Sequence, residues 1–122
     1  MNKMQALHKF WSSFGLTAYD EQTVPDNAVM PYITYRVVDD NINHPVQLSA
    51  SIWYYSSSWA AVTAKSDDIA KRLGYGFAKE RFDGGYLYIT RGTPFAQRMS
   101  DPSDDMIRRI YINLQGEFLT TY

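Results

Sequence analysis

The chain has 122 residues, of which 45% are hydrophobic and 20% are charged, and its formal net charge is −1. A chain of this size and composition is typical of one globular domain, so we expect a single domain over residues 1–122. The near-neutral charge excludes strong electrostatic attraction to nucleic acid or anionic membranes, and the absence of cysteine excludes disulfide frameworks, iron–sulfur clusters and thiol catalysis.

The beginning of the chain carries no signal for export. Residues 1–5 lack the apolar segment and small-residue cleavage site of a signal peptide. No window approaches the roughly 18 apolar residues that a membrane span requires. We therefore expect an intracellular protein without a membrane segment.

A first helix is predicted from apolar residues that recur at spacings of three and four: Met4, Leu7, Trp11 and Phe14. Gly15 is expected to end this helix. Residues 16–31 contain prolines, aspartates and an asparagine, which predict a long loop. Residues 32–38 are rich in aromatic and β-branched side chains and predict the first strand, which residues 39–41 should end.

A second strand is predicted over residues 46–54, where apolar and polar side chains alternate. Trp53 and Tyr55 are expected on its solvent-facing side. Residues 56–58 are serines, which often cap helices, and they predict a second helix that runs to about Leu73.

The last third of the chain predicts a hairpin and a long final strand. Residues 77–90 form the hairpin, with its turn at residues 83–85. Residues 91–94 should break the chain again, and an acidic loop follows at residues 100–105. The final strand covers residues 106 to about 119. Its side chains are expected to alternate between two faces, one with Met106, Ile110, Ile112 and Leu114 and the other with Arg109, Tyr111, Asn113 and Gln115. The order α-β-β-α-β-β-β predicts an α+β fold in which a mostly antiparallel sheet of about five strands carries two helices on one face.

The sequence contains no recognisable catalytic motif. A phosphate-binding loop is absent, and the glycines of residues 74–76 follow a helix rather than a strand. His8 and His44 are expected on the surface, and no serine lies in a nucleophile elbow. The aspartates of the 100–105 loop lack the spacing of a calcium site. We therefore expect no enzymatic activity, no cofactor and no bound metal.

Aromatic residues are unusually numerous, with ten tyrosines, six phenylalanines and three tryptophans. One small core cannot easily hide all of them, and tyrosine and tryptophan are enriched at protein–protein interfaces. They also stack on nucleic-acid bases, so a single-strand-binding module that uses Tyr32, Trp53 and Tyr88 remains an alternative. The strands YITYRVV and YLYIT do not match an RNA-recognition motif, which makes this alternative weaker.

Five short stretches between about residue 30 and the end of the chain are similar to a known protein family. They are PYITY (31–35), SIW (51–53) with SW (58–59), DGG (83–85), GTPFAQ (92–97) and RIYINLQGEFL (109–119). Together they resemble the tail-terminator, or tail-completion, proteins of long-tailed bacteriophages and prophages. The predicted N-terminal helix is also in the place that this family leads us to expect.

The resemblance implies a virion structural protein that assembles in the host cytoplasm as a ring, commonly a hexamer, on the end of the tail tube. Such a ring stops tube growth and joins the tail to the head. The implied partners are further copies of the chain, the tail tube protein and the head–tail connector, with no specific nucleic acid and no membrane. Another small neck or tail component is the alternative. We expect five residues at its interfaces: Trp53, Tyr55, Arg108, Arg109 and Tyr111.

Overall fold

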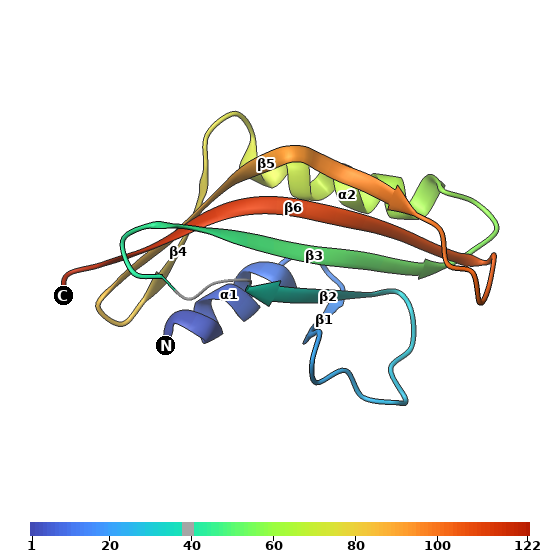
Figure 1. Ribbon diagram of the computed structural model, residues 1–122, viewed down its shortest axis with the longest axis horizontal. Coiled ribbons are helices and arrows are strands. Elements are labelled where there is room, and N and C mark those ends of the chain that lie inside the picture. The colour runs from blue at the N-terminus through green and yellow to red at the C-terminus, as the bar shows by residue number, and fades with distance from the viewer. Residues whose placement is uncertain (38–40) are drawn as a thin grey trace.

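A six-stranded sheet with two helices forms the framework of the chain (Figure 1). The structure is a computed structural model that describes residues 1–37 and 41–122. In chain order the elements are α1 (Lys3–Ser12), β1 (Thr17–Asp20), β2 (Tyr32–Val37), β3 (Pro45–Tyr55), α2 (Ala60–Leu73), β4 (Ala78–Phe82), β5 (Gly85–Met99) and β6 (Ile107–Thr120). The strands lie side by side in the order β1-β2-β3-β6-β5-β4. This arrangement confirms the predicted α+β class.

Strand β1 corrects the predicted number and pairing of strands. Residues 16–31 were expected to be a loop, but Thr17–Asp20 pair in parallel with β2. The other neighbouring strands of the described chain pair antiparallel, so the sheet is mixed and has six strands rather than about five. A four-residue edge strand carries too little periodicity to be recognised in the sequence. The next strand was predicted to end at residue 38, before a break at residues 39–41, and of these positions residues 38–40 lie outside the described residues.

Strand β5 is longer than the sequence predicts, because a bulge carries it past the expected break at residues 91–94. Its pairing with β6 shifts register between Arg91 and Ala96 and then continues to the end of the strand. Asn113 of β6 donates a hydrogen bond from Nδ2 to the Pro94 carbonyl oxygen over 2.9 Å. This side chain bridges the interrupted ladder, so the glycine and proline here produce an irregularity and not a break.

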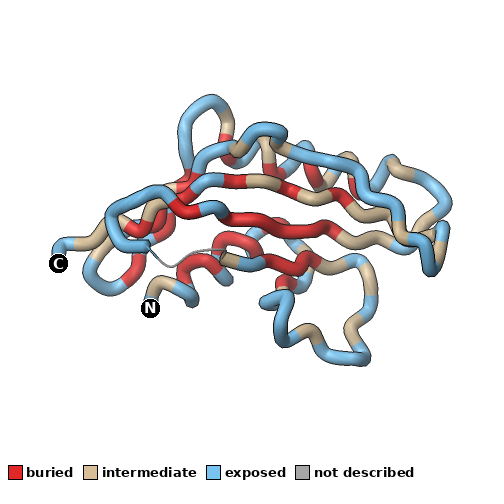
Figure 2. The backbone as a smooth tube through the Cα atoms, in the orientation of Figure 1, coloured by how far each residue is buried: buried red, intermediate tan, exposed pale blue. Residues whose placement is uncertain are grey.

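One hydrophobic core lies between the sheet and both helices, and the buried segments follow the central strands (Figure 2). The strands contribute alternate side chains, including Leu48, Ile52, Ile112, Leu114 and Phe118. The helices contribute Leu7, Phe10, Trp11, Val62, Ile69 and Leu73. Both helices therefore cover the same face of the sheet, as predicted, and no helix of the described chain lies over the other face. We call this uncovered face the outer face.

The helices differ from prediction at particular positions. Phe10 belongs to the buried stripe of α1, whereas the predicted Met4 is 44% exposed. Helix α2 begins at Ala60, with Trp59 at the N-cap position and no capping bond from the Trp59 side chain. One of the predicted capping serines supplies the bond instead, because Ser58 Oγ accepts the backbone N–H of Ala60 over 3.1 Å. In the described part of the chain, neither helix is long and apolar enough to cross a membrane.

A buried carboxylate ties both helices to the edge of the sheet. The Glu80 side chain of β4 is only 7% exposed. Its Oε1 accepts a hydrogen bond from Arg72 Nη2 of α2 over 3.1 Å, and its Oε2 lies 3.6 Å from Lys9 Nζ of α1. Since a buried carboxylate is costly without partners, these two cations are what allow an acid to stay at this position.

Glu80→Gln is expected to lower the free energy of unfolding by about 1–3 kcal/mol, because the neutral amide loses two charge-assisted contacts. The difference can be measured by urea denaturation. Glu117→Gln is the matched control, since Glu117 lies on the outer face of β6 and has no ion pair with a described residue. An unchanged midpoint for Glu80→Gln would contradict this role of the buried carboxylate.

Candidate functional site

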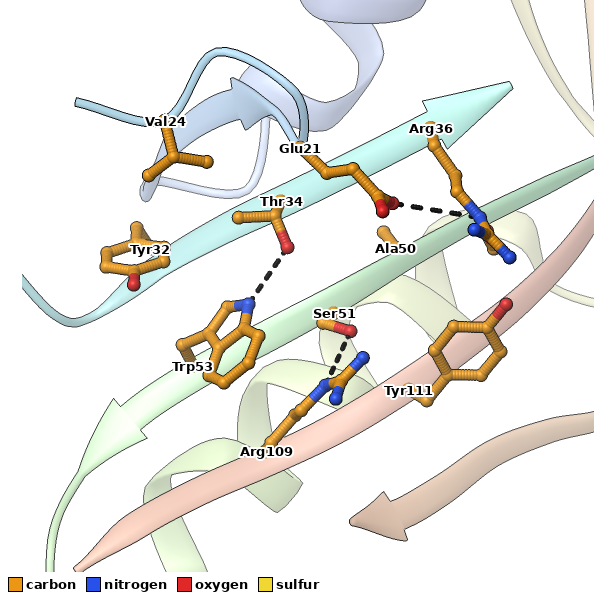
Figure 3. Close-up of a pocket in the computed structure, with 11 residues that line it drawn as sticks. Glu21, Val24, Tyr32, Thr34, Arg36, Ala50, Ser51, Trp53, Arg109 and Tyr111 are labelled. Carbon is orange, nitrogen blue, oxygen red and sulfur yellow. Dashed lines mark hydrogen bonds and ion pairs between the residues drawn. The ribbon is translucent and has the colours of Figure 1, made fainter. Parts of the chain in front are cut away.

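A pocket of about 380 Å³ lies on the outer face, where β2, β3 and β6 run side by side (Figure 3). The chain that follows β1 forms one side of it through Glu21 and Val24. Its floor carries the outward side chains of the three strands. We call this hollow the outer-face pocket.

Trp53 and Arg109 form the best-ordered part of the outer-face pocket. They are direct neighbours in the register of β3 and β6. The indole Nε1 donates to Thr34 Oγ1 over 2.9 Å, and Arg109 Nε donates to Ser51 Oγ over 2.9 Å. The guanidinium carbon of Arg109 lies 4.7 Å from the centroid of the Trp53 ring, which is a cation–π contact. Each side chain is therefore held by a hydroxyl group and by the other side chain.

A second arginine lines the same pocket. Arg36 of β2 donates from Nε to Ser49 Oγ over 3.2 Å, and the same nitrogen lies 3.7 Å from Glu21 Oε2. The terminal Nη atoms of Arg36 and Arg109 make no hydrogen bond with any described residue. The pocket thus offers two positioned guanidinium groups whose outer donors are available to an acceptor from outside the chain.

An aromatic row extends from this site to the edge of the sheet. The Tyr19 and Tyr32 ring centroids are 5.7 Å apart in an edge-on arrangement, and those of Tyr32 and Trp53 are 6.3 Å apart. Burial, and to a smaller extent the neighbouring Tyr19, raises the pKa of Tyr32. The row therefore presents neutral rings beside the charged guanidinium groups.

The structure brings three of the five predicted interface residues together: Trp53, Arg109 and Tyr111 line the pocket. Tyr55 lies outside it, at the exposed end of β3, where a hydrogen bond to Asp104 raises the pKa of its phenol. Arg108 faces the helices, with Nη2 donating to the Ser57 carbonyl oxygen over 3.0 Å. Because successive side chains of a strand alternate, Arg108 and Arg109 cannot share a face.

Several pocket residues were missed by the sequence analysis. Thr34 and Arg36 are polar and alternate along β2 with Ile33, Tyr35 and Val37, and this period-two pattern of residue types could have placed them beside Tyr32. Glu21 and Val24 left no such signal, because they lie in an irregular segment that reaches the pocket only in the folded chain.

The predicted surface histidine His8 has two polar neighbours. Its Nδ1 lies 3.0 Å from the Tyr35 hydroxyl, and its Nε2 lies 3.3 Å from Ser12 Oγ. Among the described residues, no group of three or more histidine and acidic side chains is placed to hold a metal ion.

Comparisons of this chain with family models, with curated proteins and with solved structures gave no match. The resemblance to tail terminators therefore stays a prediction.

Tyr32→Phe is expected to change how stability depends on pH. Folding raises the pKa of Tyr32 above its usual 10.0. The neutral phenol therefore contributes its full stabilisation of the fold at pH values below the usual pKa of 10.0. This contribution is lost as the pH rises through the raised value. Urea denaturation at increasing pH should show a shallower loss of stability for Tyr32→Phe than for the wild type. Tyr86→Phe, at an exposed position of β5, is the control, and identical pH profiles for Tyr32→Phe and wild type would contradict the expectation.

Proposed function

We propose that this chain is a virion structural protein that forms a ring on the end of a phage tail tube, stops tube growth and presents the surface that joins the head. The proposal combines the resemblance of the sequence to tail terminators with the chemistry of the outer face. On this proposal the chain has no catalytic activity. It assembles in the host cytoplasm and is finally located in the neck or tail of the virion. Another small neck or tail connector is the alternative within the same class.

The observation that carries this proposal is an uncovered sheet face with ordered aromatic and arginine side chains. Both helices cover the other face. Tryptophan, tyrosine and arginine are the residue types that contribute most to protein–protein binding energy. Trp53 and Arg109 are already held by hydrogen bonds, so little side-chain freedom would be lost on contact with a partner. These properties favour a protein interface.

The far part of β5 offers a second contact surface. Within the described chain, residues 96–99 pair only with β6, so the opposite edge of this segment has no strand partner. Its side chains are exposed. An open edge can accept a strand from another protein. The segment is suited to a contact with the tube or connector.

A single-strand-binding module is the second candidate, because Tyr32 and Trp53 are neighbours and two arginines lie in the same pocket. Tyr88, the third predicted stacking residue, is not part of this group. It pairs with Glu117 in β6, whereas Trp53 pairs with Arg109, eight residues away along the same strand. Steep, salt-dependent binding of single strands would favour this candidate over a ring protein.

The experiment that tests the proposal is native mass spectrometry and electron microscopy of the purified protein, alone and with tail tubes. We expect closed oligomers, either free or on tube ends. A protein that stays monomeric and does not bind tubes would overturn the proposal.

Arg109→Glu is expected to impair assembly by about tenfold or more while the chain stays folded, because the variant places a carboxylate against the indole and removes the outward donors. Sedimentation measures association, and circular dichroism checks folding. Arg81→Glu on β4 is the control, since Arg81 is exposed and outside the pocket. If Arg109→Glu assembles at the same protein concentration as the wild type, Arg109 does not belong to the interface.

A further inference from the structure

The outer-face pocket holds two guanidinium groups over one strand. Arg36 Nε donates to Ser49 Oγ over 3.2 Å, and Arg109 Nε donates to Ser51 Oγ over 2.9 Å. Arg36 reaches into the pocket from β2 and Arg109 from β6, on the two sides of β3 (Figure 3). Since Ser49 and Ser51 are two residues apart on β3, their hydroxyl groups are about 7 Å apart. The two guanidinium groups are therefore held at about this spacing.

This spacing suits one carboxylate between the two arginines. Two donor nitrogens that bond the two oxygens of one carboxylate lie roughly 5–8 Å apart. The terminal nitrogens of Arg36 and Arg109 make no hydrogen bond with any described residue. The same is true of the hydroxyl group of Tyr111, which pairs with Ser51 and lines the pocket. The pocket therefore offers unused donors from three side chains to an acceptor group.

The charges of the pocket also suit a single carboxylate. Among the described residues that line it, Glu21 is the only acid, and its Oε2 lies 3.7 Å from Arg36 Nε. Two arginines and one glutamate leave a formal charge of +1, which one carboxylate neutralises. Asp101, in the loop after β5, interacts electrostatically with Arg109, but its carboxylate accepts two hydrogen bonds from Ser103 and makes no ion pair with any described residue.

The surroundings of the two arginines favour a protein segment over a nucleic acid strand. Val24, Tyr32 and Trp53 line the pocket and provide apolar surface for the residue next to an acid. A nucleic acid strand needs a basic track for its successive phosphate groups. The outward positions of β6 beyond Arg109 carry no further cation: they are Tyr111, Asn113, Gln115 and Glu117.

We propose that the outer-face pocket binds one carboxylate side chain of a partner protein between Arg36 and Arg109, with an apolar neighbour of that acid against Trp53. The inference rests on the proposed function for the partner being a protein, and it adds the chemistry by which that partner is recognised. Both arginines keep their bonds to the serines of β3 when the carboxylate binds. Little side-chain freedom is therefore lost on binding.

NMR titration of the purified protein with two short, blocked peptides tests the site. One peptide carries a glutamate between two leucines, and the matched peptide carries glutamine in its place. The glutamate peptide should shift the indole N–H signal of Trp53 and the Nε–H signals of Arg36 and Arg109. It should bind about tenfold more tightly than the glutamine peptide, because only the carboxylate forms charge-assisted hydrogen bonds. This comparison uses the wild-type protein and does not depend on the folding of a variant.

Arg36→Gln and Arg109→Gln should each weaken binding of the glutamate peptide about fivefold, because each removes one of the two guanidinium groups. Arg109→Lys should restore only part of the affinity, since lysine keeps the charge but lacks the planar pair of donors. Arg81→Gln is the matched control: Arg81 is an exposed arginine beside the ring of Tyr86, outside the pocket. It should leave the affinity unchanged, and circular dichroism checks the folding of each variant.

The outcomes separate this inference from the proposed function. Equal binding of the two peptides, or equal losses in Arg81→Gln and Arg109→Gln, would overturn the inference. Inorganic phosphate or a single-stranded oligonucleotide that binds as tightly as the glutamate peptide would also overturn it, because a phosphate group would then be the ligand. If rings form but the glutamate peptide does not bind, the inference falls and the proposed function stands. If the peptide binds as expected but the protein forms no oligomer and binds no tube, the proposed function falls and the carboxylate site stands.

Discussion

The alternation of side chains along β3 and β6 is the constraint on which the rest of the structure depends. These two strands pair over the whole length of β3 in the middle of the sheet, and α2 packs on both of them. Because successive side chains point to opposite faces, burial of Ile52 and Ile110 sends Trp53 and Arg109 outward together. A slip of one residue would move the arginine into the core, so the hydrophobic core sets the register of the outer face as well.

Small hydroxyl residues turn this outward set into an ordered surface. Thr34, Ser49 and Ser51 each accept a hydrogen bond from a tryptophan or arginine of the pocket. The terminal nitrogens of Arg36 and Arg109 make no hydrogen bond with any described residue. An ordered cationic and aromatic surface is suited to a partner with carboxylates.

Much of the fold could be predicted because it is encoded locally. Both helices, the hairpin turn at residues 83–85 and the inward and outward faces of β6 follow from spacing and turn chemistry, and the structure confirms them. Strand β1 could not be predicted, since its hydrogen bonds come from β2. The continuation of β5 past residues 91–94 rests on backbone pairing of residues 96–99 with β6, and Asn113 of β6 adds a side-chain bond across the irregular segment. Local signals predicted a break at a place where pairing with a strand later in the chain continues.

The residues of the candidate site also fall into those that the sequence predicted and those that it did not. The pattern of the chain placed Trp53, Arg109 and Tyr111 on outward positions, and the same pattern separates Arg108 from them. The alternating pattern of the strands gave no information on Glu21, because Glu21 lies in an irregular segment that reaches the pocket only in the folded chain. The sequence by itself determined which side chains of a strand share a face, because alternation is a local property of extended backbone. Only the tertiary structure decided which strands became neighbours and which side chains meet, because that choice depends on burying the whole core at once.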